Sequence, residues 1–259
     1  MTTPVQDLFK LTGRCALITG GSRGLGLQMA QALGEMGARL ALVARKADEL
    51  EQARAQLQAQ GVEAHVFVAD LSKRESIAPL VQAVQGALGS IDVLINNAGA
   101  TWGAPAEEYP DAAWDKVMNL NVDATFALSR EAGKRCMIPQ RRGSIINIAS
   151  IAGLRGNPLP MRTIAYNTSK GAVINFTRAL AGEWGQYGVR VNALLPGFFP
   201  SKMSAGLLEN MGEQILQGTP LARLGGEQDL MGAAVFFASE ASRHVTGQCL
   251  AVDGGASAI

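Results

Sequence analysis

A tyrosine and a lysine stand four residues apart in the segment IAYNTSKGAV, residues 164–173. In a helix such residues share one face, so Tyr166 and Lys170 would lie side by side. A free phenol has a pKa of about 10. A neighbouring ammonium group favours the phenolate and would lower that pKa toward the neutral range, where general acid/base transfer is most effective. The pair alone proves nothing, because an exposed amphipathic helix can carry the same two residues.

Strands and helices in alternation would position this pair. Seven short runs rich in Val, Ile, Leu and Ala recur along the chain, separated by longer helical stretches. Several runs are apolar without alternation, which is typical of strands covered on both faces. We predict one domain, residues 1–259, with a Rossmann-like α/β fold: a doubly wound parallel sheet of seven strands with helices on both faces. The runs are CALITG (15–20), RLALVAR (39–45), AHVFVAD (64–70), IDVLINNAG (91–99), SIINIAS (144–150), RVNALLPG (190–197) and QCLAVDGG (248–255).

The stretches between the runs have helical signals. DELEQARAQLQAQG (48–61) is apolar on one side, and Gly61 stands at the expected helix stop. Residues 72–75, Ser-Lys-Arg-Glu, form a capping box that we expect to open the third helix. A further helix from residue 163 to about residue 184 would carry Tyr166 and Lys170. In sheets of this kind ligands bind beyond the carboxyl ends of the strands, so the residues after each strand are the candidate site.

A glycine-rich segment, TGGSRGLG (19–26), follows the first run. Glycines in such a turn let the backbone and the start of the next helix approach a pyrophosphate, whose charge faces the helix N-terminus. An ordinary glycine-rich turn without a ligand is the alternative. The loop residues that we expect to bind a dinucleotide are Gly20, Ser22, Arg23, Gly24, Leu25 and Gly26.

The end of the second run favours NADP (NADPH) over NAD as the cofactor. Enzymes that bind the unphosphorylated cofactor usually place an acid here, whereas an arginine suits the 2′-phosphate. Ala44 occupies the acidic position and Arg45 follows it. Arg23 in the glycine loop is a second guanidinium that could reach the same phosphate, and arginine favours bidentate phosphate contacts.

The third and fourth runs end in further candidate cofactor contacts. Asp70, followed by Leu71, could bond an adenine amino group or could shape the turn into the next helix. Asn97 and Gly99 of NNAG would let the backbone pass under the cofactor, with the asparagine amide holding neighbouring loops; an ordinary asparagine turn is the alternative.

These motifs together resemble the short-chain dehydrogenase/reductases. TGxxxGxG, NNAG, a serine closing the fifth strand, Y-x-x-x-K and a strand ending in PG occur in the family's order, and the likeness covers nearly the whole chain. The resemblance implies that Tyr166 donates a proton to a carbonyl oxygen in reduction and acts as the base in alcohol oxidation. Lys170, with the nicotinamide cation, would tune the phenol and would hold the nicotinamide ribose. Ser150 would bond the substrate oxygen, although it could also simply cap the next turn.

The resemblance assigns further residues of the site. An asparagine in the fourth helix supports a water relay to the lysine; of Asn119 and Asn121, the spacing favours Asn121. PGFFPSKM resembles the segment that holds the nicotinamide carboxamide, through Ser201 and the backbone near Phe199. The resemblance implies that residues from about 198 to 218 form a lid over the substrate; a helix that simply packs on its own domain is the alternative. The pocket-lining side chains of the lid would be Phe198, Met203, Leu207, Leu208 and Met211.

Two subgroups of the family compete for the substrate. GATWGAPAEEYPDAAWDKVMNLNV and PGFFPSKM resemble rhamnolipid-type 3-oxoacyl reductases, whereas LFKLTGRCALITGGSRGLGLQ resembles gluconate 5-dehydrogenases. We expect NADPH-dependent reduction of a ketone to a secondary alcohol, with a 3-oxoacyl thioester or similar apolar ketone as substrate. A keto-sugar acid is the alternative, and Arg155 or Arg162 would then bind its carboxylate. Of two basic positions used for carrier-protein partners, one corresponds to Arg141 and the other is Tyr187, which disfavours a carrier protein.

Composition narrows the remaining classes. The chain has 23 basic and 22 acidic residues without long runs of one sign, so nucleic acid and membrane partners are not indicated. Three distant cysteines without metal-ligand spacing predict reduced thiols and no metal site. The N-terminus lacks the apolar core of a secretory signal, so we expect a cytoplasmic protein. The resemblance also implies a homotetramer. A non-catalytic NADP sensor is the remote alternative, although the chain keeps all four catalytic positions.

Overall fold

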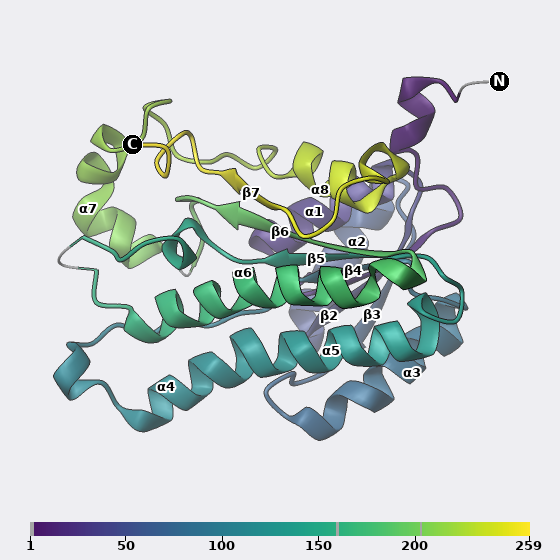
Figure 1. The fold of residues 1–259 in the computed structure, drawn as a ribbon, viewed down its shortest axis with the longest axis horizontal. Helices are drawn as coiled ribbons and strands as arrows, with labels where there is room; N and C mark the ends of the chain where they lie inside the picture. Colours follow the sequence, from purple (N-terminus) through teal and green to yellow (C-terminus); the bar gives the residue numbers. More distant parts are fainter. Residues whose placement is uncertain (1–2, 159–160, 203) are drawn as a thin grey trace.

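The computed structural model describes residues 3–158, 161–202 and 204–259. Its centre is one sheet of seven parallel strands in the order β3-β2-β1-β4-β5-β6-β7 (Figure 1). The strands are β1 (Cys15–Thr19), β2 (Arg39–Ala44), β3 (Ala64–Val68), β4 (Val93–Asn96), β5 (Gly143–Ile148), β6 (Val189–Pro196) and β7 (Cys249–Val252). The predicted parallel sheet is confirmed, and each strand falls on one of the apolar runs.

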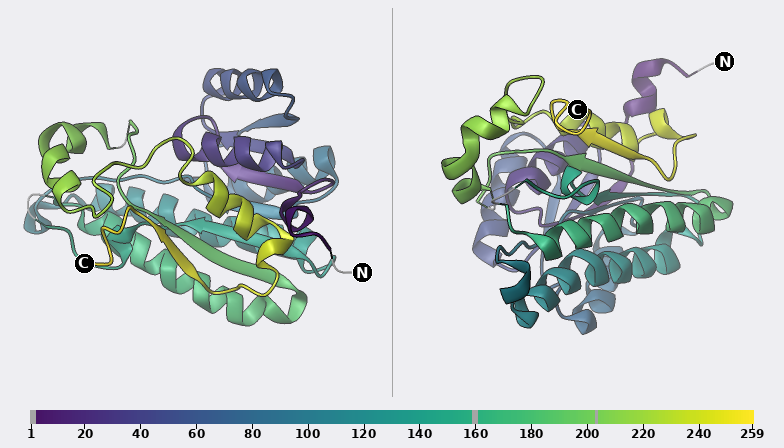
Figure 2. Two further views of the ribbon diagram at one scale, coloured as in Figure 1. Left: turned by 90° about the horizontal axis from the view of Figure 1, so that it is seen from above. Right: turned by 60° about the vertical axis from the view of Figure 1, so that its left-hand side comes forward.

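Helices cover both faces of the sheet (Figure 2). One face packs against α1 (Gly24–Glu35), α2 (Ala47–Ala59) and α8 (Met231–Ala238), and the other against α3 (Ile77–Leu88), α5 (Ala124–Ala132) and α6 (Ile164–Trp184). Successive strand residues point to opposite faces, so Leu17 packs in one core cluster and Ile18 in the other. Both faces of the sheet are therefore shielded from water by helices, which explains why the apolar runs of the strands show no alternation with polar residues.

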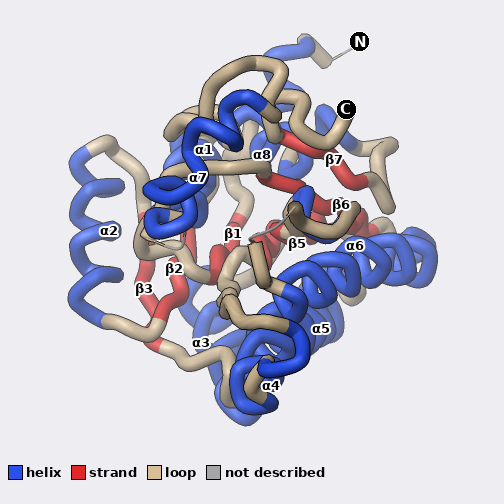
Figure 3. The backbone as a smooth tube through the Cα atoms, turned by 90° about the vertical axis from the view of Figure 1, so that its left-hand side faces the viewer, coloured by secondary structure: helices blue, strands red, loops and turns tan. Residues whose placement is uncertain are grey.

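Two further helices lie near the carboxyl ends of the strands. α4 (Asp111–Met118) continues through a π-helical turn (Asn119–Asp123) into α5, and α7 (Ala205–Gln217) lies beyond the sheet edge, at the left of Figure 1 and facing the viewer in Figure 3. Shorter helical turns span Val5–Phe9, Arg74–Ser76, Ala106–Glu108, Gly133–Met137, Ile151–Gly153, Gly185–Tyr187 and Glu240–Ser242. Within the described ranges, no helix is both long and apolar enough to cross a membrane.

The predicted capping box does not open the third helix. The hydroxyl and the amide of Ser72 both donate to Asp70 Oδ1, at 2.7 and 3.1 Å. The serine is thereby bound to the turn behind it, a 3₁₀ turn follows, and α3 begins only at Ile77. The prediction was wrong because it did not include Asp70. The charged carboxylate of this residue, two positions before Ser72, binds the serine hydroxyl that a capping box would use at the start of the helix.

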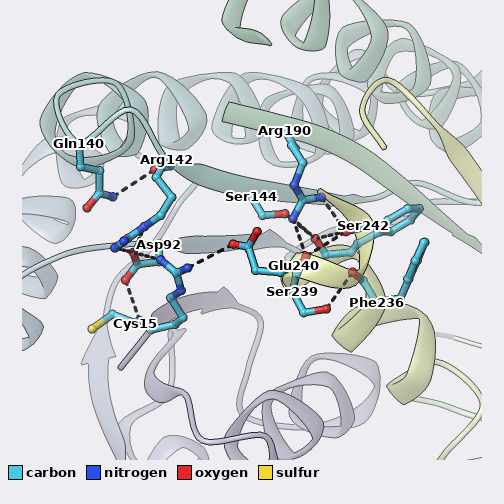
Figure 4. Close-up of polar contacts among 12 residues, drawn as sticks. Cys15, Asp92, Gln140, Arg142, Ser144, Arg190, Phe236, Ser239, Glu240 and Ser242 are labelled. Carbon is cyan, nitrogen blue, oxygen red and sulfur yellow. Dashed lines mark hydrogen bonds and ion pairs between the residues drawn. The ribbon is translucent and has the colours of Figure 1, made fainter. Parts of the chain in front are cut away.

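The amino edge of the sheet, opposite the strand ends that carry the motifs, is closed by a polar network (Figure 4). The buried carboxylate of Asp92 accepts hydrogen bonds from the Cys15 amide and from Arg142, whose Nη2 lies 2.6 Å away. Arg190 donates to the carbonyl oxygens of Phe237 and Ser239. These bonds fix the amino ends of β1, β4 and β6 to the segments around them. The predicted site residues lie at the opposite, carboxyl edge.

Candidate active site

A cavity of about 1160 Å³ opens at the carboxyl edge of the sheet. Its walls come from the segments that follow β1 to β6, from the start of α6 and from α7. The structure brings almost all of the predicted site residues together there; Asn121 lies behind the wall. Those that line the cavity are Gly20, Ser22, Arg23, Gly24, Leu25, Gly26, Arg45, Asp70, Leu71, Asn97, Gly99, Ser150, Tyr166, Lys170, Phe199 and Ser201.

The glycine loop is packed too closely for side chains. Gly20 and Gly24 have φ values of +61° and +54°, which favour glycine. A Cβ on Gly26 would lie 2.2 Å from the Gly20 carbonyl oxygen. The turn therefore lies directly against the start of α1, whose first N–H groups have no partner within the helix. These residues fit the pyrophosphate of a dinucleotide, which such a helix start binds.

Asn97 ties the NNAG segment to this loop. Its side-chain amide donates to the carbonyl oxygens of Thr19 and Gly20, at 2.9 and 3.2 Å. The Thr19 hydroxyl accepts a hydrogen bond from the backbone N–H of Asn97 at 2.9 Å and donates one to the backbone carbonyl of Ile95. The expectation that this asparagine holds neighbouring loops is confirmed, whereas Thr19 was not singled out from the sequence although it begins the glycine motif.

One end of the cavity carries several cations. Arg23, Arg45, Lys46 and Lys202 all line it. Glu49, from the first turn of α2, lies among them and was missed, because a glutamate on an exposed helix has no local pattern that marks it.

Asp70 lies near the same end of the cavity. The hydrogen bond from the Ser72 hydroxyl lowers the pKa of Asp70 below its ordinary value, and the positive charges of Arg45 and Lys73 act in the same direction. Asp70 therefore shapes its own turn, which was one of the two readings of this residue, and its carboxylate is charged beside Arg45.

α6 places Tyr166 and Lys170 on the inner wall. Lys170 Nζ lies 5.5 Å from the centroid of the Tyr166 ring and donates a hydrogen bond of 2.7 Å to the carbonyl oxygen of Ile148, the last residue of β5. Ser150 follows β5 and lines the same wall. Its hydroxyl also accepts from the Ala152 amide at 3.1 Å, so it caps the next turn while remaining part of the site.

The electrostatics of the pair differ from the sequence-based expectation. Burial raises the pKa of Tyr166, and the nearby Ser150 hydroxyl acts in the opposite direction. Burial also lowers the pKa of Lys170 to about 8, and its amine is directed to the Ile148 carbonyl. In the protein alone, burial therefore outweighs any lowering of the Tyr166 pKa. The expected lowering by Lys170 together with the nicotinamide cation stays a prediction for the cofactor complex. Tyr166 is protonated at neutral pH, which is the form that donates a proton.

Asn121 occupies the π-helical turn between α4 and α5 and is buried. Its side chain accepts from the Ala100 amide at 2.8 Å and donates to the Ala100 carbonyl at 3.0 Å and to the Ser169 hydroxyl at 2.9 Å. Ser169 in turn donates to the Tyr166 carbonyl. Asn121 thus connects the NNAG segment to α6, whereas Asn119 bonds the Ser72 carbonyl instead.

The substrate side of the cavity is formed by α7 and by the loop before α6. Phe198, Leu207 and Met211 line it as predicted, and Ile215 does so as well. Leu208 does not line the cavity, because it lies about 100° around the helix from Leu207. Met203 lies outside the described residues.

The loop between Ser150 and α6 is held by a small group of amides. Asn167 Nδ2 donates to the Ala152 carbonyl at 2.9 Å, and Asn157 Nδ2 donates to Asn167 Oδ1 at 3.1 Å. Arg155 lines the cavity but donates to the backbone oxygens of Ala256 and Ile259. Arg162 lies exposed on the cavity wall.

The family model described as short chain dehydrogenase matches residues 14–212. The chain belongs to this family. It is 41% identical over 251 residues to gluconate 5-dehydrogenase of Gluconobacter oxydans, covering 96% of each chain. It is 36% identical over 246 residues to a 3-oxoacyl-[acyl-carrier-protein] reductase of Chlamydia trachomatis, covering 95% of this chain and 98% of the relative.

A solved structure adds to this likeness. Gluconate 5-dehydrogenase from Burkholderia cenocepacia, in complex with NADP and tartrate, matches with a TM-score of 0.94 and 32% identity, covering 99% of this chain and 100% of that chain. The resemblance drawn from the sequence motifs is confirmed, and this short-chain dehydrogenase is an NAD(P)-dependent oxidoreductase.

The buried ammonium group of Lys170 predicts an unusual pH dependence of stability. A fall of its pKa from 10.5 to about 8 corresponds to about 3 kcal/mol against the charged form. Between those pH values the unfolded chain binds a proton that the folded chain lacks, so stability rises with pH. We expect wild type to gain about 1 kcal/mol per pH unit relative to Lys170→Met between pH 8 and 10, measured by urea unfolding.

The matched control is Lys134→Met, which removes an exposed lysine. It should change the free energy of unfolding by less than about 0.5 kcal/mol at each pH. If the difference between wild type and Lys170→Met is constant over this pH range, the lowered pKa of Lys170 is wrong.

Proposed function

We propose that this short-chain dehydrogenase uses NADPH to reduce a ketone to a secondary alcohol, with Tyr166 as proton donor. The observation that carries the proposal is the position of Ser150, Tyr166 and Lys170 on one wall of the cavity that also contains the glycine loop. The reverse reaction, alcohol oxidation, uses the same groups in the opposite direction.

The bound nicotinamide supplies the hydride that the ketone carbon accepts. The chain does the rest. Ser150 donates a hydrogen bond to the substrate oxygen and orients the carbonyl group. The Tyr166 phenol, protonated at neutral pH, transfers its proton to that oxygen as negative charge develops there. Lys170 stabilises the phenolate that remains, and Asn121 holds the surrounding segments for the return of a proton from water.

The cationic end of the cavity supports NADPH as the preferred cofactor. Arg45 follows β2 and Arg23 precedes α1, and both line the cavity beside the glycine loop, so they are the residues that would hold the 2′-phosphate. The position at the end of β2 that would accept a bond from a free 2′-hydroxyl is Ala44, which has no acceptor side chain.

For the substrate we propose a 3-oxoacyl thioester or a similar apolar ketone. Residues 198–218 act as a lid whose apolar side, with Leu207, Met211 and Ile215, faces the cavity. Arg141 and Tyr187 precede β5 and β6 and therefore lie at the amino edge, away from this cavity. A coenzyme A thioester fits this arrangement better than a carrier protein docked at those two positions.

A keto-sugar acid is the second candidate. It is favoured by the 41% identity to a gluconate 5-dehydrogenase and by the exposed Arg162 on the cavity wall. Arg155 is the weaker choice for a carboxylate, because its guanidinium already bonds backbone oxygens.

The proposed enzyme works as a homotetramer in the cytoplasm. Phe126 of α5 and Leu250 of β7 are each 41% exposed, and Phe126 packs edge-on against Phe176 of α6. Apolar side chains of this size at helix and strand surfaces support burial between subunits. The free thiols of Cys15, Cys136 and Cys249 are compatible with a reducing compartment.

Replacing the proton donor tests the mechanism. Tyr166→Phe keeps the ring and removes the hydroxyl, so turnover should fall by about 1,000-fold or more, within the range for loss of a general acid. NADPH binding, followed by fluorescence titration, should change less than threefold. Turnover within tenfold of wild type would exclude Tyr166 as the acid.

Replacing the arginine after β2 tests the cofactor assignment. Arg45→Ala should weaken NADPH binding by about 10- to 100-fold, because a charged hydrogen bond to the phosphate contributes about 1.5–3 kcal/mol. NADH binding should change less than twofold. Equal losses for both cofactors would remove the phosphate role of this residue.

A matched substrate panel separates the two substrate classes. Initial rates of NADPH oxidation are compared for acetoacetyl-coenzyme A and 5-ketogluconate, and we expect kcat/KM to be at least tenfold higher for the thioester. The reverse order would establish the keto-sugar acid reading and make Arg162 the next residue to replace. NADPH binding without turnover of any ketone would instead favour a non-catalytic sensor.

A further inference from the structure

A single glutamate lies inside the cationic end of the cofactor cavity. Both carboxylate oxygens of Glu49 accept from Arg23 Nη1, at 2.8 and 2.9 Å, and Oε1 also accepts from Lys46 Nζ at 3.1 Å. The Glu49 side chain is 19% exposed, whereas Arg23 and Lys46 are 53% and 64% exposed. The carboxylate is therefore the sheltered member of the cluster, and its two partners face the solvent.

Nothing in the packing of α2 requires this contact. The buried side of α2 is formed by Leu50, Ala53 and Leu57, and Glu49 lies beside that face. The next acid on the helix, Glu51, pairs with Arg54 at 2.7 Å and does not line the cavity. Glu49 instead reaches across to the glycine loop, 26 residues away in sequence.

The charge of Glu49 is maintained at neutral pH. The hydrogen bond from Lys46 lowers the pKa of Glu49 below its ordinary value, and the charges of Arg23 and Lys202 act in the same direction. A phosphate that enters this end of the cavity therefore meets the Glu49 carboxylate, which is already bound to the guanidinium group of Arg23.

We propose that Glu49 is an internal counter-ion of the 2′-phosphate site and limits the preference for NADPH over NADH. The inference rests on the proposed function, in which Arg23 and Arg45 bind that phosphate. The phosphate must share Arg23 with Glu49 and is repelled by the carboxylate. A free 2′-hydroxyl meets no such repulsion and can donate a hydrogen bond to it. Glu49 thus shifts the selectivity toward the unphosphorylated cofactor.

The test compares cofactor affinities in Glu49→Gln. The amide keeps the shape of the side chain, and its one oxygen can still accept from Arg23, so the main change is the loss of the negative charge together with one acceptor. The carboxylate carries one negative charge and the phosphate nearly two, so relieving their repulsion at about 5 Å in a water-like medium should let NADPH bind about tenfold more tightly. NADH should bind equally or more weakly. Dissociation constants of both cofactors are measured by fluorescence titration at one fixed, low ionic strength.

Glu51→Gln is the matched control, because it makes the same charge change on the same helix but outside the cavity. It should change both dissociation constants less than twofold. A ratio of NADPH to NADH affinity that stays the same or falls in Glu49→Gln overturns the inference; a fall would mean that the carboxylate merely orients Arg23.

Arg23→Ala separates this inference from the proposed function. If Arg23→Ala weakens NADPH but Glu49→Gln does not raise the NADPH preference, the counter-ion role alone is wrong. If Arg23→Ala and Arg45→Ala both leave NADPH binding unchanged, the phosphate site itself is wrong, and both proposals fail.

Discussion

The hydrogen bond from Lys170 Nζ to the Ile148 carbonyl connects α6 to the end of β5, and the candidate active site depends on it. Tyr166 lies one helical turn before Lys170, and Ser150 lies two residues after Ile148. Together with the bonds from Asn167 to the Ala152 carbonyl and from Asn121 to Ser169, this bond fixes the relative position of all three groups. Burying an ammonium group is unfavourable, as the pKa of about 8 shows. The rest of the core must supply the stability that keeps it there.

Close backbone packing at the glycine loop is the second constraint on the shape of the site. The Gly20 carbonyl leaves no room for a Cβ on Gly26, and Asn97 bonds the carbonyls of both Thr19 and Gly20. The loop, the NNAG segment and the start of α1 therefore form one rigid unit at the crevice between β1 and β4, where the direction of the strand order changes. A ligand bound here meets preorganised N–H groups rather than flexible side chains.

The parts of the site that could be predicted from sequence depend on local geometry. A four-residue spacing puts Tyr166 and Lys170 on one face, and apolar runs without alternation define the strands. What failed depends on contacts that no spacing encodes. Asp70 takes the Ser72 hydroxyl and delays α3, and in the protein alone the burial of Tyr166 outweighs the charge of Lys170. The pairing of Glu49 with Arg23 joins elements that only the folded sheet brings together.

The two halves of the cavity differ in how they are built, and this explains why the reaction is easier to infer than the substrate. The cofactor half is fixed by strand ends and glycine contacts, so its motifs specify its shape. The substrate half is formed by side chains of α7 and of the loop before α6, which lie outside the sheet. There Leu207 and Met211 offer an apolar wall while Arg162 adds a cation. Substitutions at such positions change the substrate without disturbing Tyr166, Lys170 or the core.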